Sequence, residues 1–176
     1  MFNKILVAID RLLINQAVFE KALTLAKMTG ASLMIVHVLS PYEEGYPEMP
    51  FLSNLDSYPG RDDASVRLYL EQWEAFKEQG LSLLRARAAV ASALGINVEY
   101  IQIPGTPGYT ICDLARTWGA DLIILGRRGR SGISEFIMGS VSNYVTHHAT
   151  CSVLTVHHPL NSSPKVSETD QIASVP

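Results

Sequence analysis

The feature that most constrains the fold is a regular alternation of short apolar runs with segments of helical periodicity. The apolar runs, rich in Ile and Val, are Lys4–Asp10, Ser32–Ser40, Asn97–Pro104, Asp121–Gly126 and Ser152–His157. Runs that are apolar on both alternating faces are typical of strands covered on both sides, as in a parallel sheet. We therefore predict a strand at each run.

Helical periodicity fills the intervals between the predicted strands. The helical segments are Asn15–Gly30, Val66–Leu94, Thr106–Trp118 and Ser134–Ala149. This alternation predicts an α/β fold: a five-stranded parallel sheet, doubly wound and Rossmann-like, with helices on both faces and right-handed crossovers. We expect the strand order 3-2-1-4-5. In such a sheet, ligands bind beyond the carboxyl ends of the strands where the winding direction reverses, so functional residues should follow the strands.

The 176 residues, 47% of them hydrophobic, are enough for one domain with a sizeable core. We assign that domain to residues 1–158. Residues 41–63 are rich in Pro, Tyr and acids and are too long for an ordinary connection, so they predict an excursion. Residues 159–176 are polar and poor in aromatics, which predicts a disordered tail.

Charge and composition exclude several classes of function. The net charge is -3 with acids and bases interspersed, which disfavours nonspecific binding of nucleic acid or anionic lipid. No apolar stretch is long enough to span a membrane, and the N-terminus lacks a signal-peptide pattern, so we expect a cytoplasmic protein. Cys112 and Cys151 have no metal-ligand spacing, and we expect buried free thiols in a reducing compartment.

Two polar residues lie in or directly after the first two strands. Asp10 follows the first strand, where its carboxylate can accept hydrogen bonds from ribose hydroxyls or hold a metal-bound water. Alternatively, Asp10 is the N-cap of the next helix. His37 lies inside the second strand, and we interpret it as a structural histidine with satisfied hydrogen bonds and no catalytic role.

A glycine- and arginine-rich segment follows the fourth strand. Gly126 and Gly129 bracket a turn that a ligand can approach closely, and Gly139 to Ser142 supply two hydroxyls and a run of amides. Amides at a helix start suit a phosphate, and the arginines of the segment add charge: Arg127, Arg128 and Arg130. The segment matches neither a Walker A loop nor the dinucleotide fingerprint. A plain surface loop remains the alternative interpretation.

The spacing Gly126-x2-Gly129-x9-Gly139-Ser140 resembles the pattern of the ATP-binding universal stress proteins. Other elements of that family are similar in the same order: Asp10 at the end of strand one, His37-Val38, Gly105-Thr106-Pro107, the strand Ala120–Gly126 and the strand Cys151–Val156. The resemblance runs from about residue 3 to residue 157 and leaves out the excursion and the tail.

The resemblance implies an adenine nucleotide bound at the point where the winding reverses. The residues implied for each part of it are Ile9 and Val38 for adenine, Asp10, Leu125 and Gly126 for ribose, and Gly129, Gly139, Ser140, Val141 and Ser142 for the phosphates. Mg²⁺ would bridge phosphate oxygens, and Arg127 and Arg128 would favour a polyphosphate. The family also implies a homodimer through Ser152–Val156. The bulky residues 11–14 depart from the family, which usually has small residues there.

We therefore expect an adenine-nucleotide-binding regulatory or stress-response protein, with ATP as the first choice and AMP or another adenylate as alternatives. A slow ATPase or other nucleotide-processing enzyme is the second hypothesis. A structural dimer module without nucleotide binding is the third. No general base is placed next to the phosphates by the sequence, so we assign no catalytic residue and do not expect fast hydrolysis.

Overall fold

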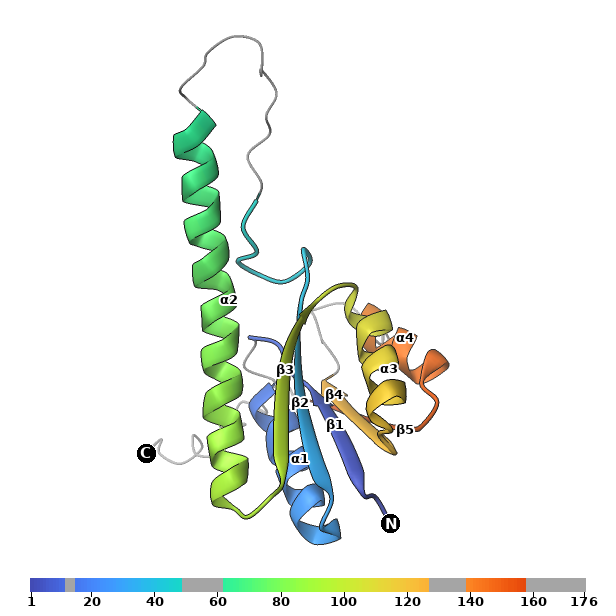
Figure 1. Cartoon of the computed structure of the whole chain (residues 1–176). Coiled ribbons are helices and arrows are strands. Elements are labelled where there is room, and N and C mark those ends of the chain that lie inside the picture. Colours follow the sequence, from blue (N-terminus) through green and yellow to red (C-terminus); the bar gives the residue numbers. More distant parts are fainter. Residues whose placement is uncertain (12–14, 49–61, 127–138, 158–176) are drawn as a thin grey trace, which may run out of the picture.

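The computed structural model describes residues 1–11, 15–48, 62–126 and 139–157. Strands and helices alternate along the chain (Figure 1). In order they are β1 (Lys4–Ala8), α1 (Asn15–Thr29), β2 (Ser32–Leu39), α2 (Asp62–Ala93), β3 (Val98–Pro104), α3 (Pro107–Trp118), β4 (Leu122–Gly126), α4 (Ser140–His148) and β5 (Ser152–Val156).

The strands form one sheet in the order β3-β2-β1-β4-β5, and every neighbouring pair is parallel. This confirms the predicted fold class and strand order. The chain moves outward from β1 to β2 and β3, then returns to the other side of β1 for β4 and β5. The winding direction therefore reverses between β1 and β4.

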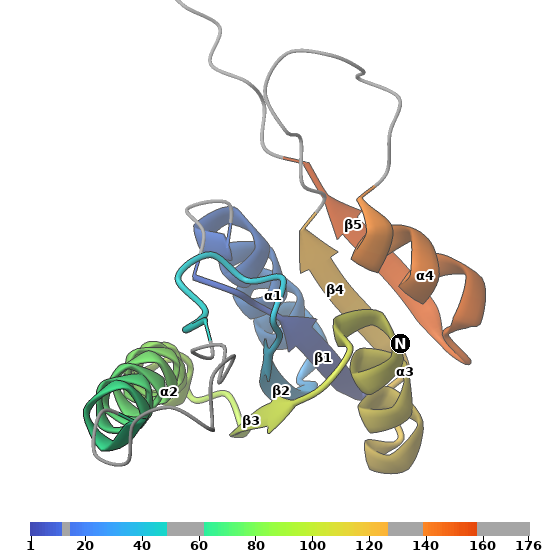
Figure 2. The same ribbon diagram turned by 90° about the horizontal axis from the view of Figure 1, so that it is seen from above.

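Helices cover both faces of the sheet (Figure 2): α1 and α2 lie on one face, and α3 and α4 on the other. Each face has its own core. In β1, Ile5 and Val7 enter the core beneath α1 and α2, whereas Leu6 enters the core beneath α3 and α4. Because both sets of alternating side chains are buried, the central strands carry runs of consecutive apolar residues, such as 5–8 in β1 and 33–36 in β2, rather than an apolar residue at every second position.

Several predicted boundaries differ from the observed ones. β1 ends at Ala8, so Asp10 lies beyond the strand, and α2 begins at Asp62 rather than Val66. The described part of the last helix begins at Ser140. Residues 134–138 of its predicted range, 49–61 of the predicted excursion and the predicted tail at 159–176 lie outside the described residues.

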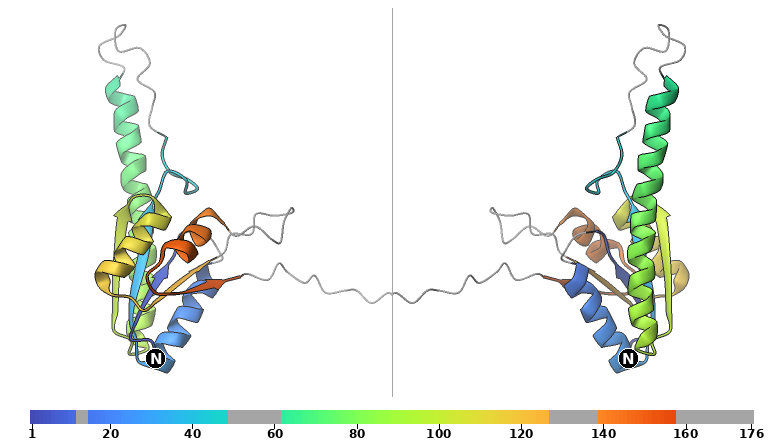
Figure 3. Two further views of the ribbon diagram at one scale, coloured as in Figure 1. Left: turned by 90° about the vertical axis from the view of Figure 1, so that its right-hand side faces the viewer. Right: turned by 90° about the vertical axis from the view of Figure 1, so that its left-hand side faces the viewer.

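Helix α2 is much longer than the strands it accompanies. Its 32 residues span about 48 Å. The C-terminal half packs on the sheet through Leu84, Ala88 and Ala91. The N-terminal half projects beyond the carboxyl edge of the sheet (Figure 3).

The prediction that Cys112 and Cys151 are buried free thiols is correct only in part. Both are free, as expected, but both are half-buried rather than buried. Cys112 lies on α3 and Cys151 precedes β5, and each packs against the core beneath α3 and α4. Burial raises the pKa of the Cys112 thiol. The pKa of the Cys151 thiol is also raised, mainly by burial and to a smaller extent by the nearby charges of Asp121 and Cys112.

Candidate functional site

A cavity of about 340 Å³ lies at the carboxyl edge of the sheet, where the winding direction reverses. Its volume falls within the range common for small-molecule sites. The lining residues come from the ends of β1, β2 and β4, the segment after β2, and the starts of α3 and α4: Ala8, Ile9, Asp10, Val36, Val38, Ser40, Tyr42, Glu43, Thr106, Pro107, Gly108, Tyr109, Ile111, Leu125, Gly126, Gly139, Ser140, Val141, Ser142 and Tyr144.

Part of the wall is apolar and rigid. Ile9, Val38 and Leu125 come from three adjacent strand ends, and all three are buried. The parallel ladder extends past β1, because the Ile9 N–H donates to the Val36 carbonyl at 2.9 Å. The Val38 and Leu125 side chains belong to the core beneath α3 and α4 and form a surface that suits a flat apolar group, whereas the Ile9 side chain belongs to the core beneath α1 and α2.

Asp10 provides a carboxylate at this otherwise apolar wall. It is half-buried and lies directly after Ile9, beyond the end of β1. The described part of helix α1 begins at Asn15, and residues 12–14 before it lie outside the described residues, so the interpretation of Asp10 as the N-cap of that helix stays a prediction. A carboxylate in this position can accept hydrogen bonds from ligand hydroxyls.

Arg11, the first of the bulky residues that depart from the family, does not line the cavity. Its guanidinium lies 5.1 Å from the centre of the Phe76 ring on α2. The Arg11 side chain therefore points toward α2. Residues 12–14, the rest of this departure, lie outside the described residues.

The start of α4 forms another part of the wall. Gly139 is the N-cap, and Ser140, Val141 and Ser142 form the first turn, in which there is no acidic residue. The first N–H groups of a helix have no partner within it and carry a partial positive charge. The buried Ser142 hydroxyl donates to the Gly139 carbonyl at 2.9 Å, which holds the turn in place.

The start of α3 also reaches the cavity, and we did not assign it to the site from the sequence. Thr106, Pro107, Gly108 and Tyr109 all line the wall. Gly108 allows this approach, because a Cβ there would lie 2.8 Å from Cδ1 of Tyr144 on α4. The available signal was the Gly-x-Pro element followed by a second glycine, which is unusual inside the first turn of a helix.

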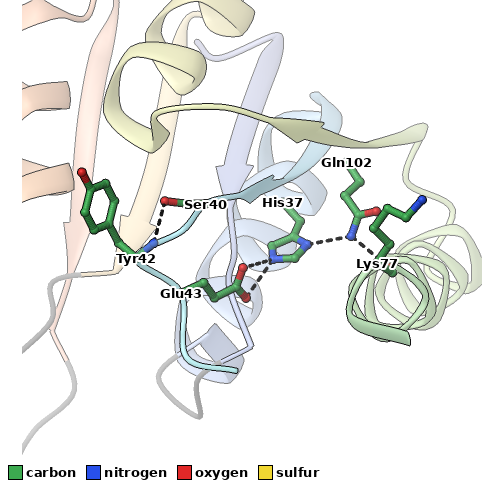
Figure 4. A network of polar contacts seen from close by, with 6 residues as sticks. All are labelled: His37, Ser40, Tyr42, Glu43, Lys77 and Gln102. Carbon is green, nitrogen blue, oxygen red and sulfur yellow. Dashed lines mark hydrogen bonds and ion pairs between the residues drawn. The ribbon is translucent and has the colours of Figure 1, made fainter. Parts of the chain in front are cut away.

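The segment after β2 supplies Ser40, Tyr42 and Glu43 to the wall, and these were also missed. Glu43 is anchored on the opposite face of the sheet (Figure 4). Both of its carboxylate oxygens lie 3.0 Å from Nε2 of His37, which is fully buried in β2. The other ring nitrogen, Nδ1, lies 3.0 Å from Nε2 of Gln102 on β3.

These contacts determine the tautomer of His37. The Gln102 amide nitrogen also donates to the Lys77 carbonyl at 3.1 Å, which fixes the orientation of that amide. An amide nitrogen can only donate, so Nδ1 of His37 accepts, and Nε2 carries the proton and donates to Glu43. His37 is thus a structural histidine with both nitrogens paired, as predicted.

All predicted site residues within the described part of the chain line this single cavity: Ile9, Asp10, Val38, Leu125, Gly126, Gly139, Ser140, Val141 and Ser142. Arg127, Arg128 and Gly129 lie outside the described residues. The structure thus brings together segments from four parts of the chain. Their role in binding a ligand stays a prediction.

A doubly wound parallel α/β sheet with a cavity at its switch point places the chain among the Rossmann-like proteins. Residues 1–157 match the Universal stress protein family. The chain belongs to that family.

Known relatives agree with this assignment. The universal stress protein Sll1388 of Synechocystis is 33% identical over 161 residues, covering 89% of this chain and 99% of that protein. The universal stress protein YxiE of Bacillus subtilis is 34% identical over 156 residues, covering 89% and 99% respectively.

Solved structures share the fold. The universal stress protein UspA from Lactobacillus plantarum superposes with a TM-score of 0.66 at 24% identity, covering 88% of this chain and 97% of that one. A family protein from Arabidopsis thaliana, solved with AMP bound, has a TM-score of 0.57 at 20% identity, covering 93% and 97%. A universal stress protein in complex with cAMP also has a TM-score of 0.57, at 22% identity, covering 89% and 97%.

The described ranges contain neither a membrane-spanning helix nor a cluster of metal ligands. None of their helices is both long and apolar enough to cross a membrane. Within the same residues, no group of three or more His, Cys, Asp or Glu side chains is arranged to hold a metal ion.

Proposed function

We propose that this universal stress protein binds an adenine nucleotide in the cavity at the carboxyl edge of the sheet, and that it acts as a regulatory protein of the stress response. ATP is our first choice, with AMP and cyclic nucleotides as the alternatives to compare. The observation that carries the proposal is the convergence of Asp10, Val38, Gly126 and Gly139 to Ser142 on one cavity. Family members solved with AMP and with cAMP support it.

The chemistry of the wall fits the parts of a nucleotide. The buried side chains of Val38 and Leu125 offer apolar contact to a base, and Ile9 lines the cavity beside them. The Asp10 carboxylate can accept from ribose hydroxyls, and the N–H groups at the start of α4 can donate to phosphate oxygens. Arg127, Arg128 and Gly129 are proposed to make further contacts with the phosphates.

Other parts of the proposal concern the metal and the assembly. Since the described residues contain no cluster of metal ligands, Mg²⁺ would be held through the phosphates of the nucleotide. We propose a cytoplasmic homodimer formed through β5, because β5 is an edge strand and its backbone is available to pair with a second copy.

A regulatory role needs a route from the cavity to a distant surface. Glu43, on the cavity wall, is hydrogen-bonded to His37, and His37 to Gln102, which reaches the Lys77 carbonyl on α2. A ligand that shifts the segment after β2 would therefore change the contacts of α2. This route supports a binding protein whose occupancy is sensed rather than an enzyme with fast turnover.

The proposal is tested by mass analysis of small molecules released from the purified protein and by calorimetric titration with ATP, AMP and cAMP. The main variant is Gly139→Val. The φ of Gly139 is −58°, which valine adopts readily, so the variant should fold while its side chain enters the proposed phosphate region. We expect a loss of ATP affinity of at least about a hundredfold, or about 2.7 kcal/mol.

A matched control is Thr150→Val, which places the same side chain at an exposed position beyond the other end of α4. It should bind as the wild-type protein does. Normal ATP binding by Gly139→Val would refute the phosphate assignment. Neither released nucleotide nor heat with the wild-type protein would refute nucleotide binding and favour the structural dimer module, whereas phosphate release during titration would favour the slow ATPase.

A further inference from the structure

Tyr42 has an unusual environment for a large aromatic side chain. It is 82% exposed, yet it lines the cavity. Solvent exposure of a tyrosine ring gives up the free energy that burial of its apolar surface would supply. A ring held in water at the wall of a largely apolar cavity is available to a ligand in that cavity.

The backbone that presents Tyr42 is held in place from both sides. The Tyr42 N–H donates to the Ser40 hydroxyl at 3.3 Å, and the Glu43 N–H donates to the Ser40 carbonyl at 3.0 Å. Ser40 itself is buried. These bonds form a turn, Ser40–Glu43, whose conformation is defined although the ring it carries is exposed.

The next residue, Glu43, anchors this turn to the interior. Its side chain is buried and accepts from His37 Nε2 at 3.0 Å. Figure 4 shows the Tyr42 and Glu43 side chains leaving the turn in different directions, with Glu43 turned toward His37 and α2. Gly80 on α2 leaves room for this arrangement, because a Cβ there would lie 2.5 Å from His37 Nδ1.

A buried ionic anchor next to an exposed ring is costly as a purely structural feature. Removal of a carboxylate from water must be offset by strong hydrogen bonds, and within the described residues the Glu43 carboxylate accepts only from Nε2 of His37. The same turn could rest on an apolar side chain without that cost. The ionic anchor gives the turn a single defined position, which a preorganised binding residue requires.

We propose that Tyr42 stacks on the planar ring of the bound ligand and that Glu43, through His37, is the residue that positions it. This inference rests on the proposed function and deepens it: the ligand class is one with a flat heteroaromatic ring, and its ring is recognised partly by stacking. Stacking does not require a hydrogen-bond pattern, so Tyr42 contributes affinity for the base.

The first experiment compares ATP with ribose 5-phosphate, which lacks the base, by calorimetric titration. Tyr42→Ala should weaken ATP binding about tenfold, since stacking on one base is commonly of that size. Tyr42→Phe keeps the ring and should bind within about twofold of the wild type. The control Tyr100→Ala removes a half-exposed tyrosine from β3, away from the cavity, and should have no effect. Binding of ribose 5-phosphate should be unchanged in every variant.

The second experiment tests the positioning role with a double-mutant cycle. Glu43→Ala should weaken ATP binding in the wild-type background and have no further effect in the Tyr42→Ala background, because both changes remove the same contact. Thermal unfolding of each variant verifies that it is folded at the temperature of titration.

The outcomes separate this inference from the proposed function. Equal ATP affinity of the wild type and Tyr42→Ala overturns the stacking role alone. Additive losses for Tyr42→Ala and Glu43→Ala overturn the positioning role, because they indicate that Glu43 acts independently of the ring. No ATP binding by the wild-type protein overturns the proposed function and this inference together.

Discussion

Gly80 lies in the interior of α2, where glycine is normally unfavourable, and its replacement by alanine tests how tightly α2 packs on the buried polar network. A Cβ at Gly80 would lie 2.3 Å from Nε2 of Gln102 and 2.5 Å from Nδ1 of His37. Gln102 is a flexible side chain that can move aside. His37 is fully buried and bonded at both nitrogens, so its ring is the contact that decides the outcome.

Opposing effects set the size of the change in stability. Alanine favours the helix over glycine by about 1 kcal/mol. Overpacking costs about 1–3 kcal/mol, and displacement of Gln102 leaves a buried polar group unsatisfied at a cost of about 1–3 kcal/mol. We expect a net destabilisation of about 3 kcal/mol, which lowers Tm by roughly 6–12 °C in a protein of this size.

Urea unfolding followed by circular dichroism measures the free energy of unfolding directly. Ser82→Ala is the matched control, because it also places alanine on α2 but at an exposed position, and it should be neutral or stabilise by about 0.5 kcal/mol. The double variant Gly80→Ala, Gln102→Ala should lose less than the two single changes together. If Gly80→Ala is as stable as the wild type or more so, helix propensity outweighs packing and the close approach of α2 to His37 is not rigid.

Two further predictions concern other close contacts. Gly108→Ala places a Cβ 2.8 Å from Cδ1 of Tyr144, so it should separate α3 from α4, lower Tm by several degrees and weaken ATP binding, as thermal unfolding and titration would measure; unchanged values would contradict the packing role of Gly108. Because burial raises the pKa of the Cys112 and Cys151 thiols, less thiolate is present at pH 7.5 than in the unfolded chain. Their reaction with Ellman's reagent should therefore be slower in the native protein and reach its full rate only at higher pH; equal native and unfolded rates would argue against shielding.

Much of the fold follows from local patterns in the sequence. Strand β4 is apolar at every position, and β1 is apolar at every position after Lys4, because the sheet is covered on both faces, and this pattern is visible without the structure. The helices that alternate with them leave few topologies open. The predicted strand order 3-2-1-4-5 is one of these few topologies, and the structure confirms it.

The candidate site was predictable where it follows strand ends. Asp10 and Gly126 were assigned from their places after strands and from the glycine spacing, Val38 was assigned from the resemblance to the family, and all three line the cavity. The roles proposed for Arg127, Arg128 and Gly129 remain predictions. The N-cap alternative for Asp10 also remains a prediction, because residues 12–14, before the described start of α1 at Asn15, lie outside the described residues.

The start of α3 and the turn Ser40–Glu43 were not predictable in the same way. Gly108 matters because Tyr144 of α4 packs against it, and Glu43 matters because His37 and Gln102 meet beneath α2. The periodicity of a sequence predicts helices and strands, but it does not predict which residue of one element contacts which residue of another.

The amino-acid sequence by itself determined the alternation of elements, the two-sided core and the edge of the sheet at which a ligand would bind, because these depend on burial patterns that repeat along the chain. Only the tertiary structure decided that Tyr42 is presented to the cavity by a buried His37–Glu43 pair and that α3 joins α4 at the wall. The contact between α3 and α4 joins residues far apart in the chain, and the His37–Glu43 pair is completed by Gln102 of β3 and by α2, so both depend on the packing of whole elements against one another.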